Sequence, residues 1–339
     1  MNRLGIAIVL LFVTTTLSAQ NWNVPENNPE ELGDVNWIRN YDQALKTAKK
    51  EKKPIFILFQ EVPGCSTCRN YGNDILSDPL IVEAIESEFV PLCIYNNLKG
   101  HDRKILEKYN EPTWNNPVVR IVDNQGSDIV DRVSGNYSKQ GIIDAIMDAM
   151  QSEGNVVPTY IQNLETEYTA VNTDELVLGM YCFWSGEKAL AEIPGVIKSQ
   201  AGFMNGSEVV KLVFDKDKIS STSIVSKAKS ENCADVVFSD SRRFKNVKTK
   251  KSGKFRGDKE SKYYLYKSPY KSIPMTPYQQ LKANHELSQG GDISYILSPR
   301  QLALWKIVKK NNWTKNYIDV DLASAWNEVV MLTDTEEGE

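Results

Sequence analysis

The chain has 339 residues, of which 41% are hydrophobic and 25% charged, a composition typical of folded globular proteins. Its formal net charge of −4 gives no general reason to expect nucleic acid as a partner. At roughly 100–200 residues per domain, this length predicts two domains.

The first twenty residues differ from everything that follows. MNR supplies a positive start, and the apolar run GIAIVLLFVTTTLSA ends before it is long enough for a permanent span. This pattern predicts a secretory signal peptide over residues 1–20, cleaved near Ala19 or Gln20; an uncleaved N-terminal anchor is the alternative. No later segment is apolar for long enough to cross a membrane. We therefore expect a periplasmic or secreted protein without a stable membrane span after cleavage.

Export changes how the cysteines are interpreted. There are five: Cys65, Cys68, Cys93, Cys182 and Cys233. They could form static bridges with one spare thiol, but the chain is too large to need such bridges and two of them form a CxxC motif, which favours working thiols. His101 and His285 have no neighbouring ligand pattern, so neither a metal site nor a cofactor is expected.

The first part of the chain alternates between helical and strand patterns. In order, these are a helix over 38–52, a strand over 55–60, a helix beginning at the CxxC motif, a helix over 80–89, a strand over 90–96, a helix over 101–110, a hairpin formed by 117–123 and 128–135, and a helix over 138–150. This order predicts an α/β domain over residues 21–155.

The second part follows an expected linker over residues 156–172. The patterns there predict a strand over 174–183, a helix over 184–193, strands over 195–203 and 207–215, and a helix over 221–231. This order suggests a split β-α-β sandwich within a domain over 173–315. The basic stretch 242–262 is interpreted as a solvated mobile loop, with an anionic partner as the alternative. Residues 316–339, which end in TDTEEGE, are expected to form a C-terminal tail.

The CxxC motif is the first candidate site. Cys65 stands at an expected helix start, where unpaired amides favour the thiolate, and Cys68 is placed to resolve a mixed disulfide. A CxxC motif can also be half of a zinc site. Because no second pair or histidine cluster accompanies it, redox chemistry is the favoured interpretation.

Residues 37–150 resemble the thioredoxin-like superfamily in motif and in element order. In that family a cis proline precedes the third strand and faces the active cysteines, and Pro117 is the matching position. The resemblance therefore implies a thiol–disulfide oxidoreductase fold in which Pro117 contributes to substrate binding.

The motif departs from that family at several positions. Gly64 stands in place of a tryptophan, Ser66-Thr67 replaces Gly-Pro, and Phe59 occupies the position of a buried acid. Glu61 is the alternative group for proton transfer. Cys93, in mid-strand, is expected to be a buried core residue.

The stretch YCFWSGE, residues 181–187, is the second candidate site. Cys182 is expected at the end of a strand and the start of a helix, a position that favours thiolate. Phe183 and Trp184 either pack in the core or form an apolar box for a methyl group beside that sulfur.

The wider segment is similar to the A-type peptide methionine sulfoxide reductases. The resemblance runs through residues 174–222 and rests on YCFWSGE, the PGV turn, the GF strand and SEVVKLVFD. It implies a ferredoxin-like α+β domain and a preference for the S-sulfoxide. By this resemblance Cys182 attacks the sulfoxide sulfur, Phe183 and Trp184 hold the S-methyl group, and Glu208 protonates the oxygen.

The attack converts the cysteine to a sulfenic acid, which a nearby thiol condenses to a disulfide. Cys233 is the other cysteine of this domain and is the candidate resolving residue; a small buried hydrophobe is the alternative. Glu187 is expected to be structural, with catalysis as the alternative.

This segment also departs from its family. Tyr181 and Ser185 replace glycines, and the stretch between the GF strand and SEVV is reduced to MNG, which removes a tyrosine that binds the sulfoxide oxygen. Tyr266, in YLYKSPY, is placed at the family's later tyrosine, with Tyr181 or Tyr263 as alternatives. The aspartate that precedes this tyrosine has no clear match.

Together these patterns predict an exported reductase of methionine sulfoxide in oxidised proteins or peptides. The CxxC domain would return Cys182 to its reduced state, and an external thiol donor would recharge the CxxC domain. The alternative is a thiol–disulfide oxidoreductase whose second domain is a non-catalytic binding module.

Overall fold

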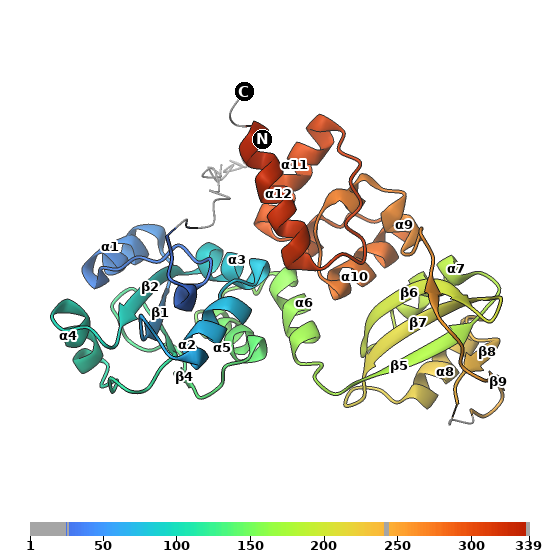
Figure 1. The fold of residues 1–339 in the computed structure, drawn as a ribbon, viewed down its shortest axis with the longest axis horizontal. Coiled ribbons are helices and arrows are strands. Elements are labelled where there is room, and N and C mark those ends of the chain that lie inside the picture. Colours follow the sequence, from blue (N-terminus) through green and yellow to red (C-terminus); the bar gives the residue numbers. More distant parts are fainter. Residues whose placement is uncertain (1–24, 26, 241–243, 337–339) are drawn as a thin grey trace, which may run out of the picture.

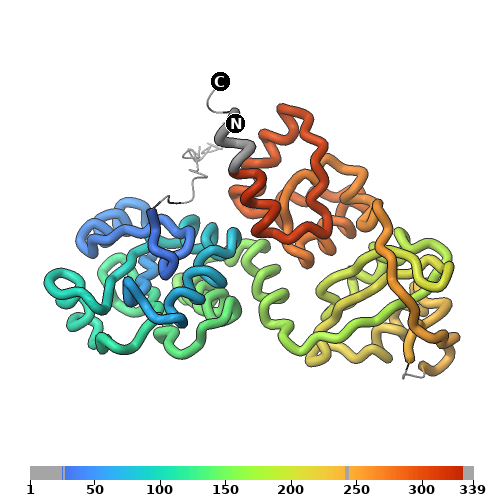
Figure 2. The backbone as a smooth tube through the Cα atoms, viewed as in Figure 1, coloured from blue at the N-terminus to red at the C-terminus, as the bar shows by residue number. Residues whose placement is uncertain are grey.

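A computed structural model describes residues 25, 27–240 and 244–336, so the predicted signal peptide over 1–20 lies outside the described residues. The chain folds into an N-terminal lobe (residues 27–168), a second lobe (residues 173–257) and a C-terminal helical unit (residues 263–336). The helical unit returns toward the N-terminal lobe after the second lobe has formed (Figure 2).

The N-terminal lobe is built on a four-stranded sheet of order β2-β1-β3-β4. Its strands are β1 (Ile55–Gln60), β2 (Val90–Tyr95), β3 (Val118–Val122) and β4 (Val133–Ser134). Strand β2 runs parallel to β1, and β3 runs antiparallel to it. Strand β1 is buried along its whole length, as its continuous apolar run predicts.

Helices cover this sheet on both sides (Figure 1). They are α1 (Tyr41–Glu51), α2 (Ser66–Asp74), α3 (Pro79–Glu88), α4 (His101–Lys108) and α5 (Lys139–Ser152), preceded by the short turn η1 (Glu30–Leu32). Asn40, Asp78 and Ser138 cap three of them by accepting hydrogen bonds from first-turn amides. The predicted hairpin is present only in part, because its second arm pairs as a strand at Val133–Ser134 alone.

The predicted linker over 156–172 is wrong for most of its length, because α6 (Thr159–Tyr168) is a helix. Its residues Tyr160, Ile161 and Leu164 are buried in the core of the N-terminal lobe. The spacing of these apolar residues is that of one face of a helix, and burial of this face stabilises it.

The second lobe contains a six-stranded sheet of order β10-β6-β7-β5-β8-β9. In chain order its elements are β5 (Thr173–Gly179), α7 (Phe183–Leu190), β6 (Val196–Met204), β7 (Ser207–Asp215), α8 (Ser221–Ser230), β8 (Val236–Phe238), β9 (Lys248–Lys250) and β10 (Arg256–Gly257). Strands β5 and β6 both pair antiparallel with β7, which lies between them, so the sheet has the split β-α-β arrangement. Cys182 is outside the strand predicted to contain it, because β5 ends at Gly179.

The basic stretch and the short MNG segment both have defined positions in this sheet. The basic stretch 242–262 is not a mobile loop throughout, because it contributes β9 and β10 to the two edges of the sheet. The shortened MNG segment is a tight hairpin, with Met204 paired to Ser207. Asn205 and Gly206 both have positive φ, 50° and 77°, as a two-residue Asn-Gly hairpin requires.

The C-terminal helical unit has a core of its own. It comprises α9 (Tyr263–Tyr266), η2 (Pro269–Ser272), α10 (Pro277–Ser288), η3 (Ser294–Ile296), α11 (Pro299–Asn311) and α12 (Leu322–Glu336). Capping boxes begin α10 and α11, formed by Thr276 with Gln279 and by Ser298 with Gln301.

The predicted tail over 316–339 is corrected by α12. Tyr317, Ala325 and Val329 are buried in the same cluster as Leu265 and Leu304, so this segment completes a hydrophobic core. The acidic ending TDTEEGE is what made it resemble a tail. Among the helices of the described ranges, none has the length and apolar character needed to cross a membrane.

The helical unit contacts both lobes. Toward the N-terminal lobe, the Arg300 amide donates to Glu83 Oε1 at 2.6 Å. Toward the second lobe, Lys282 donates to the Ala191 carbonyl at 3.1 Å, and Leu281 of α10 is buried in the second lobe's core. The two lobes are therefore joined through this unit as well as through α6.

Candidate functional site

The first thiol site lies where β1 passes into α2. Cys65 is the exposed residue that precedes the helix, and Cys68 is buried in its first turn, with 3.7 Å between the two sulfurs. Hydrogen bonds from the helix, first from the Cys68 backbone, lower the pKa of Cys65. Burial and the neighbouring Cys65 raise the pKa of Cys68 to about 11. The exposed sulfur is thus the more readily ionised of the two, as the predicted roles of Cys65 as attacking thiol and Cys68 as resolving thiol require.

The loop before β3 closes over this site. The Asn116–Pro117 peptide bond is cis, and the Cys68 thiol donates to Asn116 Oδ1 at 2.8 Å. This contact places the Pro117 segment directly against the pair of thiols. Asn116 was not singled out from the sequence, although its position before Pro117 was the signal that could have identified it.

Gly64 has no room for a side chain. A Cβ there would lie 2.4 Å from the Glu61 carbonyl oxygen and 2.6 Å from Cys68 Cβ. The Gly64 amide donates to Glu31 Oε1 at 2.7 Å. The tight turn into α2 therefore explains why glycine replaces the tryptophan that the resemblance leads one to expect.

Glu61 also lies beside the thiols. A carboxylate oxygen of Glu61 and the sulfurs of Cys65 and Cys68 all lie within 4.8 Å of one another, so these three residues could hold a metal ion. The same distances allow Glu61 to exchange protons with the site. Cys93 is fully buried, and burial raises the pKa of its thiol to about 12, which makes it an unreactive core residue.

The second thiol site lies where β5 passes into α7. Cys182 is the half-buried residue that precedes α7. The Phe183 amide donates to Glu208 Oε2 at 3.1 Å, so the carboxylate that β7 supplies lies at the start of the helix next to Cys182. The Met180 amide donates to the Glu208 carbonyl, which fixes the intervening turn against β7.

Aromatic rings form a wall beside Cys182. The ring centroid of Phe183 is 5.4 Å from that of Trp184 and 5.3 Å from that of Phe203. Trp184 is stacked on Tyr263, with 4.2 Å between ring centroids. Phe183 is buried in the lobe's core, as the core-packing interpretation expects, whereas Trp184 is only partly buried.

Asp258 belongs to this wall, and the sequence patterns did not identify it. The Trp184 indole donates to Asp258 Oδ2 at 3.2 Å. The feature that could have identified it is its position five residues before Tyr263, in a segment interpreted as a mobile loop. The structure groups Tyr263 with Trp184, whereas Tyr266 is in contact with Lys267 and Lys271. Tyr181 is 94% exposed.

Cys233 lies at the same end of the sheet as Cys182. Gly179 of β5 pairs with Val236 of β8, so Cys182 follows one strand end and Cys233 precedes the adjacent one. Burial raises the pKa of Cys233, and the charges of Glu231, Asp235 and Cys182 add to the increase. The two thiols thus lie beside adjacent strand ends of the same sheet.

Glu187 is completely buried and anchors structure. Its carboxylate accepts hydrogen bonds from Ser199, Ala201, Ser261 and Lys262. Burial raises its pKa. These four donors tie α7 to β6 and to the start of the helical unit.

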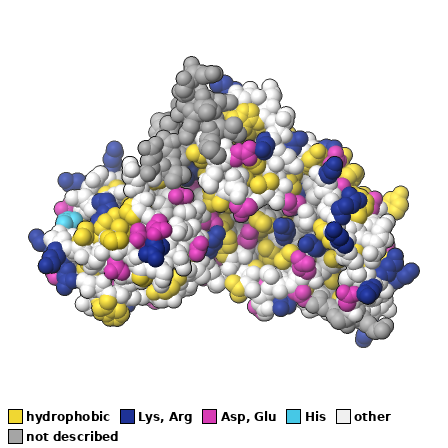
Figure 3. Space-filling view, in the orientation of Figure 1, with side chains coloured by type: hydrophobic (Ala, Val, Ile, Leu, Met, Phe, Trp, Pro, Cys, Tyr) yellow, Lys and Arg dark blue, Asp and Glu magenta, His cyan; other side chains and the backbone are white. Residues whose placement is uncertain are grey.

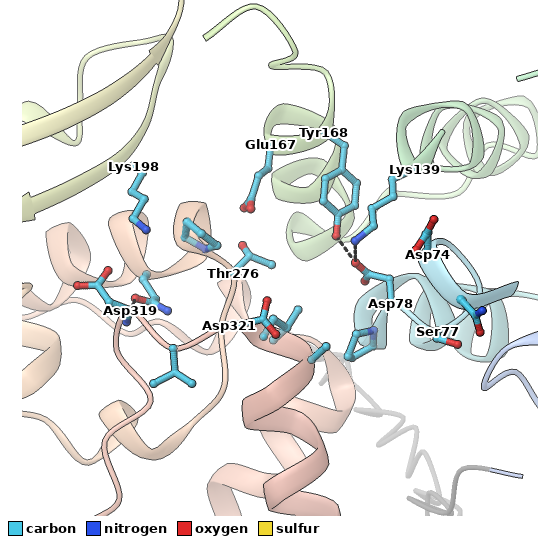
Figure 4. A pocket seen from close by; sticks show the side chains of 17 residues that line it. Asp74, Ser77, Asp78, Lys139, Glu167, Tyr168, Lys198, Thr276, Asp319 and Asp321 are labelled. Atoms are coloured by element: carbon cyan, nitrogen blue, oxygen red, sulfur yellow. Dashed lines mark hydrogen bonds and ion pairs between the residues drawn. The ribbon is translucent and has the colours of Figure 1, made fainter. Parts of the chain in front are cut away.

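A polar cavity of about 700 Å³ lies between the N-terminal lobe and the helical unit (Figure 4). In it Asp78 accepts from Lys139 and from the Tyr168 hydroxyl, at 2.6 and 2.7 Å. None of its described lining residues is a cysteine, so this cavity is separate from both thiol sites.

A family model matches the part of the chain that contains the first site. Residues 36–124 match the family model described as thioredoxin-like. Among solved structures, a DsbH oxidoreductase is 17% identical, covers 38% of this chain and 93% of its own, and has a TM-score of 0.31. A thioredoxin from Thermus thermophilus is 18% identical, covers 35% of this chain and 90% of its own, and also has a TM-score of 0.31.

A shorter similarity concerns another family. The peptide methionine sulfoxide reductases MsrA of Methanococcus maripaludis strains C5 and C6 are each 50% identical to this chain over 36 residues. The match spans 11% of this chain and 23% of the length of each reductase. The N-terminal part of the chain is thus thioredoxin-like, and the Cys65–Cys68 motif lies within the matched residues.

Proposed function

We propose that this protein is an exported reductase of methionine sulfoxide in proteins or peptides, with Cys182 as its nucleophile. The observation that carries the proposal concerns the two residues that follow Cys182: the Phe183 amide donates to the Glu208 carboxylate at the start of α7, and Trp184 is stacked on Tyr263. The strand order β8-β5-β7-β6 with α7 and α8 is that of a ferredoxin-like fold and supports it. The short similarity to methionine sulfoxide reductases points the same way.

The groups present suffice for the chemistry. The Cys182 thiolate attacks the sulfoxide sulfur while Glu208 delivers a proton to the oxygen, since an oxyanion is a poor leaving group. The methyl group lies against Phe183 and Trp184. The oxygen is transferred from the sulfoxide sulfur to the Cys182 sulfur, so the sulfoxide S–O bond breaks and Cys182 becomes a sulfenic acid. Methionine is released. The Cys233 thiol then condenses with it, forming a disulfide and releasing water.

Single-turnover reduction tests this proposal. A C65S/C68S variant, fully reduced and freed of reductant, is expected to convert one methionine-sulfoxide peptide per chain and to contain a Cys182–Cys233 disulfide by peptide mapping. C182S is expected to yield no methionine. C233S is expected to yield methionine and to leave a sulfenic acid that dimedone labels. Full activity of C182S would show that the nucleophile is elsewhere.

One observation favours a second candidate function. The Asn205–Gly206 turn leaves no loop between β6 and β7, and with it goes the tyrosine expected to bind the sulfoxide oxygen. In this case the second lobe is a binding module and all redox activity belongs to Cys65. Reduction of a disulfide peptide would then be abolished by C65S and unaffected by C182S, with no methionine formed by any variant.

A further inference from the structure

We propose that the Cys65–Cys68 site of one chain reduces the Cys182–Cys233 disulfide of a second copy, not that of its own chain. This inference rests on the proposed function of Cys182. Its starting point is the arrangement in Figure 1, where α2 and α7 lie in separate lobes with α6 and α10 between them. Helix α6 packs against α5, and α10 packs against both α6 and α7. Three successive helix packings, each about 8–10 Å between axes, thus separate α5 from α7.

The contacts at both ends of the helical unit maintain this separation. At the N-terminal lobe, Arg300 is bonded to Glu83 through its amide and to Glu86 through its guanidinium. At the second lobe, Glu187 of α7 accepts a hydrogen bond from the Lys262 amide at 2.6 Å, and the completely buried Lys262 side chain is paired with Asp319 at 2.7 Å. Breaking such pairs leaves buried charges without partners, so the lobes do not swing together freely.

Helix α6 is held from both sides as well. Its Tyr160 and Leu164 belong to the core of the N-terminal lobe, and Glu167 accepts from the Tyr278 amide of α10 at 3.1 Å. The segment expected to be a flexible linker is therefore a packed spacer. A flexible linker brings two sites together at a high effective concentration, whereas a spacer of this kind keeps them apart.

Charge favours a second copy as the partner. The N-terminal lobe, residues 27–168, has 14 basic and 22 acidic side chains, a formal net charge of −8, whereas the second lobe, residues 173–257, has 15 basic and 10 acidic ones, a net charge of +5. Figure 3 shows Lys and Arg side chains gathered along the edge of the second lobe, and a smaller group at the far tip of the N-terminal lobe. Opposite net charges allow the N-terminal lobe of one chain to approach the second lobe of another.

Each thiol has an exposed apolar neighbour for such a contact. Trp114, two residues before Asn116, is 80% exposed, and Leu98 is 47% exposed. The Asn97 side-chain Nδ2 donates to the Val62 carbonyl at 3.1 Å, which holds the Leu98 loop beside the turn into α2. On the second lobe, Tyr181 is 94% exposed and adjoins Cys182. Large exposed aromatics are typical of contact surfaces.

The transfer balances without another reactant. The Cys65 thiolate attacks Cys182, the more accessible sulfur of the disulfide, and forms an intermolecular disulfide while Cys233 leaves as thiolate. Cys233 takes the proton of the Cys68 thiol. The Cys68 thiolate then attacks Cys65, forms the Cys65–Cys68 disulfide and releases Cys182 as thiolate. Two electrons pass from one pair to the other, and an external dithiol restores the first.

The yield of methionine per chain tests the route. Reduced wild-type protein without added reductant has electrons for two methionines per chain. We expect the first at a rate independent of protein concentration, and the second at a rate proportional to protein concentration and slowed by salt. A second methionine at a concentration-independent rate would establish transfer within one chain and overturn the inference. Its absence at every concentration would also overturn the inference.

Trapping identifies the sulfurs. Reduced C68S/C182S protein is mixed with C65S/C68S protein that contains the Cys182–Cys233 disulfide. We expect a disulfide-linked dimer in which peptide mapping finds Cys65 joined to Cys182. The matched control, C65S/C182S, retains Cys68 and is expected to form no dimer. Equal dimer yields from both would overturn the assignment. If C65S/C68S forms no methionine at all, the proposed function fails and this inference fails with it. If methionine forms but no disulfide passes between chains, only this inference fails.

Discussion

Trp184 donates its indole hydrogen to Asp258, 74 residues further along the chain, at 3.2 Å. The same indole is stacked on Tyr263, which follows Asp258 by five residues. One short segment thus supplies both an acceptor for the edge of the indole and a ring for its face. The orientation of the ring beside Cys182 therefore depends on residues outside the segment that contains the cysteine.

This relationship predicts a graded effect of substitution at Asp258. D258A removes the acceptor, and we expect kcat/KM for a methionine-sulfoxide peptide to fall about tenfold, the equivalent of one net hydrogen bond. D258N retains an oxygen acceptor and is expected to restore most of the activity. Equal losses in both variants would indicate that the carboxylate charge, not the orientation of the indole, is what the reaction needs.

The two sulfurs of the first site are predicted to differ in reactivity. Hydrogen bonds lower the pKa of Cys65, so more of it is thiolate at neutral pH than for an ordinary cysteine, and alkylation should reach half its maximal rate at correspondingly lower pH. The pKa of Cys68 is about 11, so its alkylation should rise only in strongly alkaline solution. Mass spectrometry of iodoacetamide-treated reduced protein across pH measures both rates, and similar profiles would contradict the assignment.

A methyl group at position 64 is predicted to destabilise the thioredoxin-like domain. In G64A the new Cβ would lie within 2.6 Å of backbone and Cys68 atoms that cannot move independently, and such overpacking costs about 1–3 kcal/mol. Denaturant unfolding measures the loss. G257A is the matched control, because its Cβ would meet only the tip of the Gln200 side chain, at 3.1 Å. A G64A protein as stable as wild type would show that the turn can relax.

Because Glu83 is buried, we predict that the free energy of unfolding depends on pH. Burial raises the pKa of this carboxyl to about 7, so the folded protein binds its proton more tightly than the unfolded chain does. Its stabilising contribution is complete below about pH 4.5 and is lost as pH rises through about 7. E83Q keeps an oxygen for the Arg300 amide and has no charge to bury.

Relative to wild type, E83Q should therefore gain stability between pH 5 and pH 8, by up to about 3 kcal/mol. Free energies of unfolding at both pH values measure the difference. E107Q, on the exposed face of α4, is the control, and its difference from wild type should be the same at both. A pH-independent E83Q difference would show that Glu83 remains ionised throughout.

Strong local periodicity made part of this fold predictable. IFILFQ predicts a buried strand, which β1 confirms, and SEVVKLVFD forms β7 over the predicted residues. The serine that precedes residues 139–152 caps the helix as expected. Residue spacing of this kind fixes which face of an element is buried, and that information is contained within each segment.

Features that depend on distant partners were not predictable. Helix α6 was interpreted as a linker because most of its residues are polar; its order depends on the core of the N-terminal lobe on one side and on the bond between Glu167 and the Tyr278 amide on the other. Asp258 lies in a run of lysines, where its pairing with Trp184 leaves no local pattern. The segment 316–336 likewise has its apolar residues spread thinly, and their burial depends on α9–α11.

The bond between Arg300 and Glu83 joins residues 217 positions apart. A ribosome therefore releases the thioredoxin-like domain long before the segment that covers Glu83 exists. Throughout that interval Glu83 lacks the Arg300 amide that bonds to its carboxylate in the finished fold. The first domain therefore folds with a polar patch on α3 that the last helices bury later. The finished molecule forms only when synthesis of the chain is complete, and not when the first core closes.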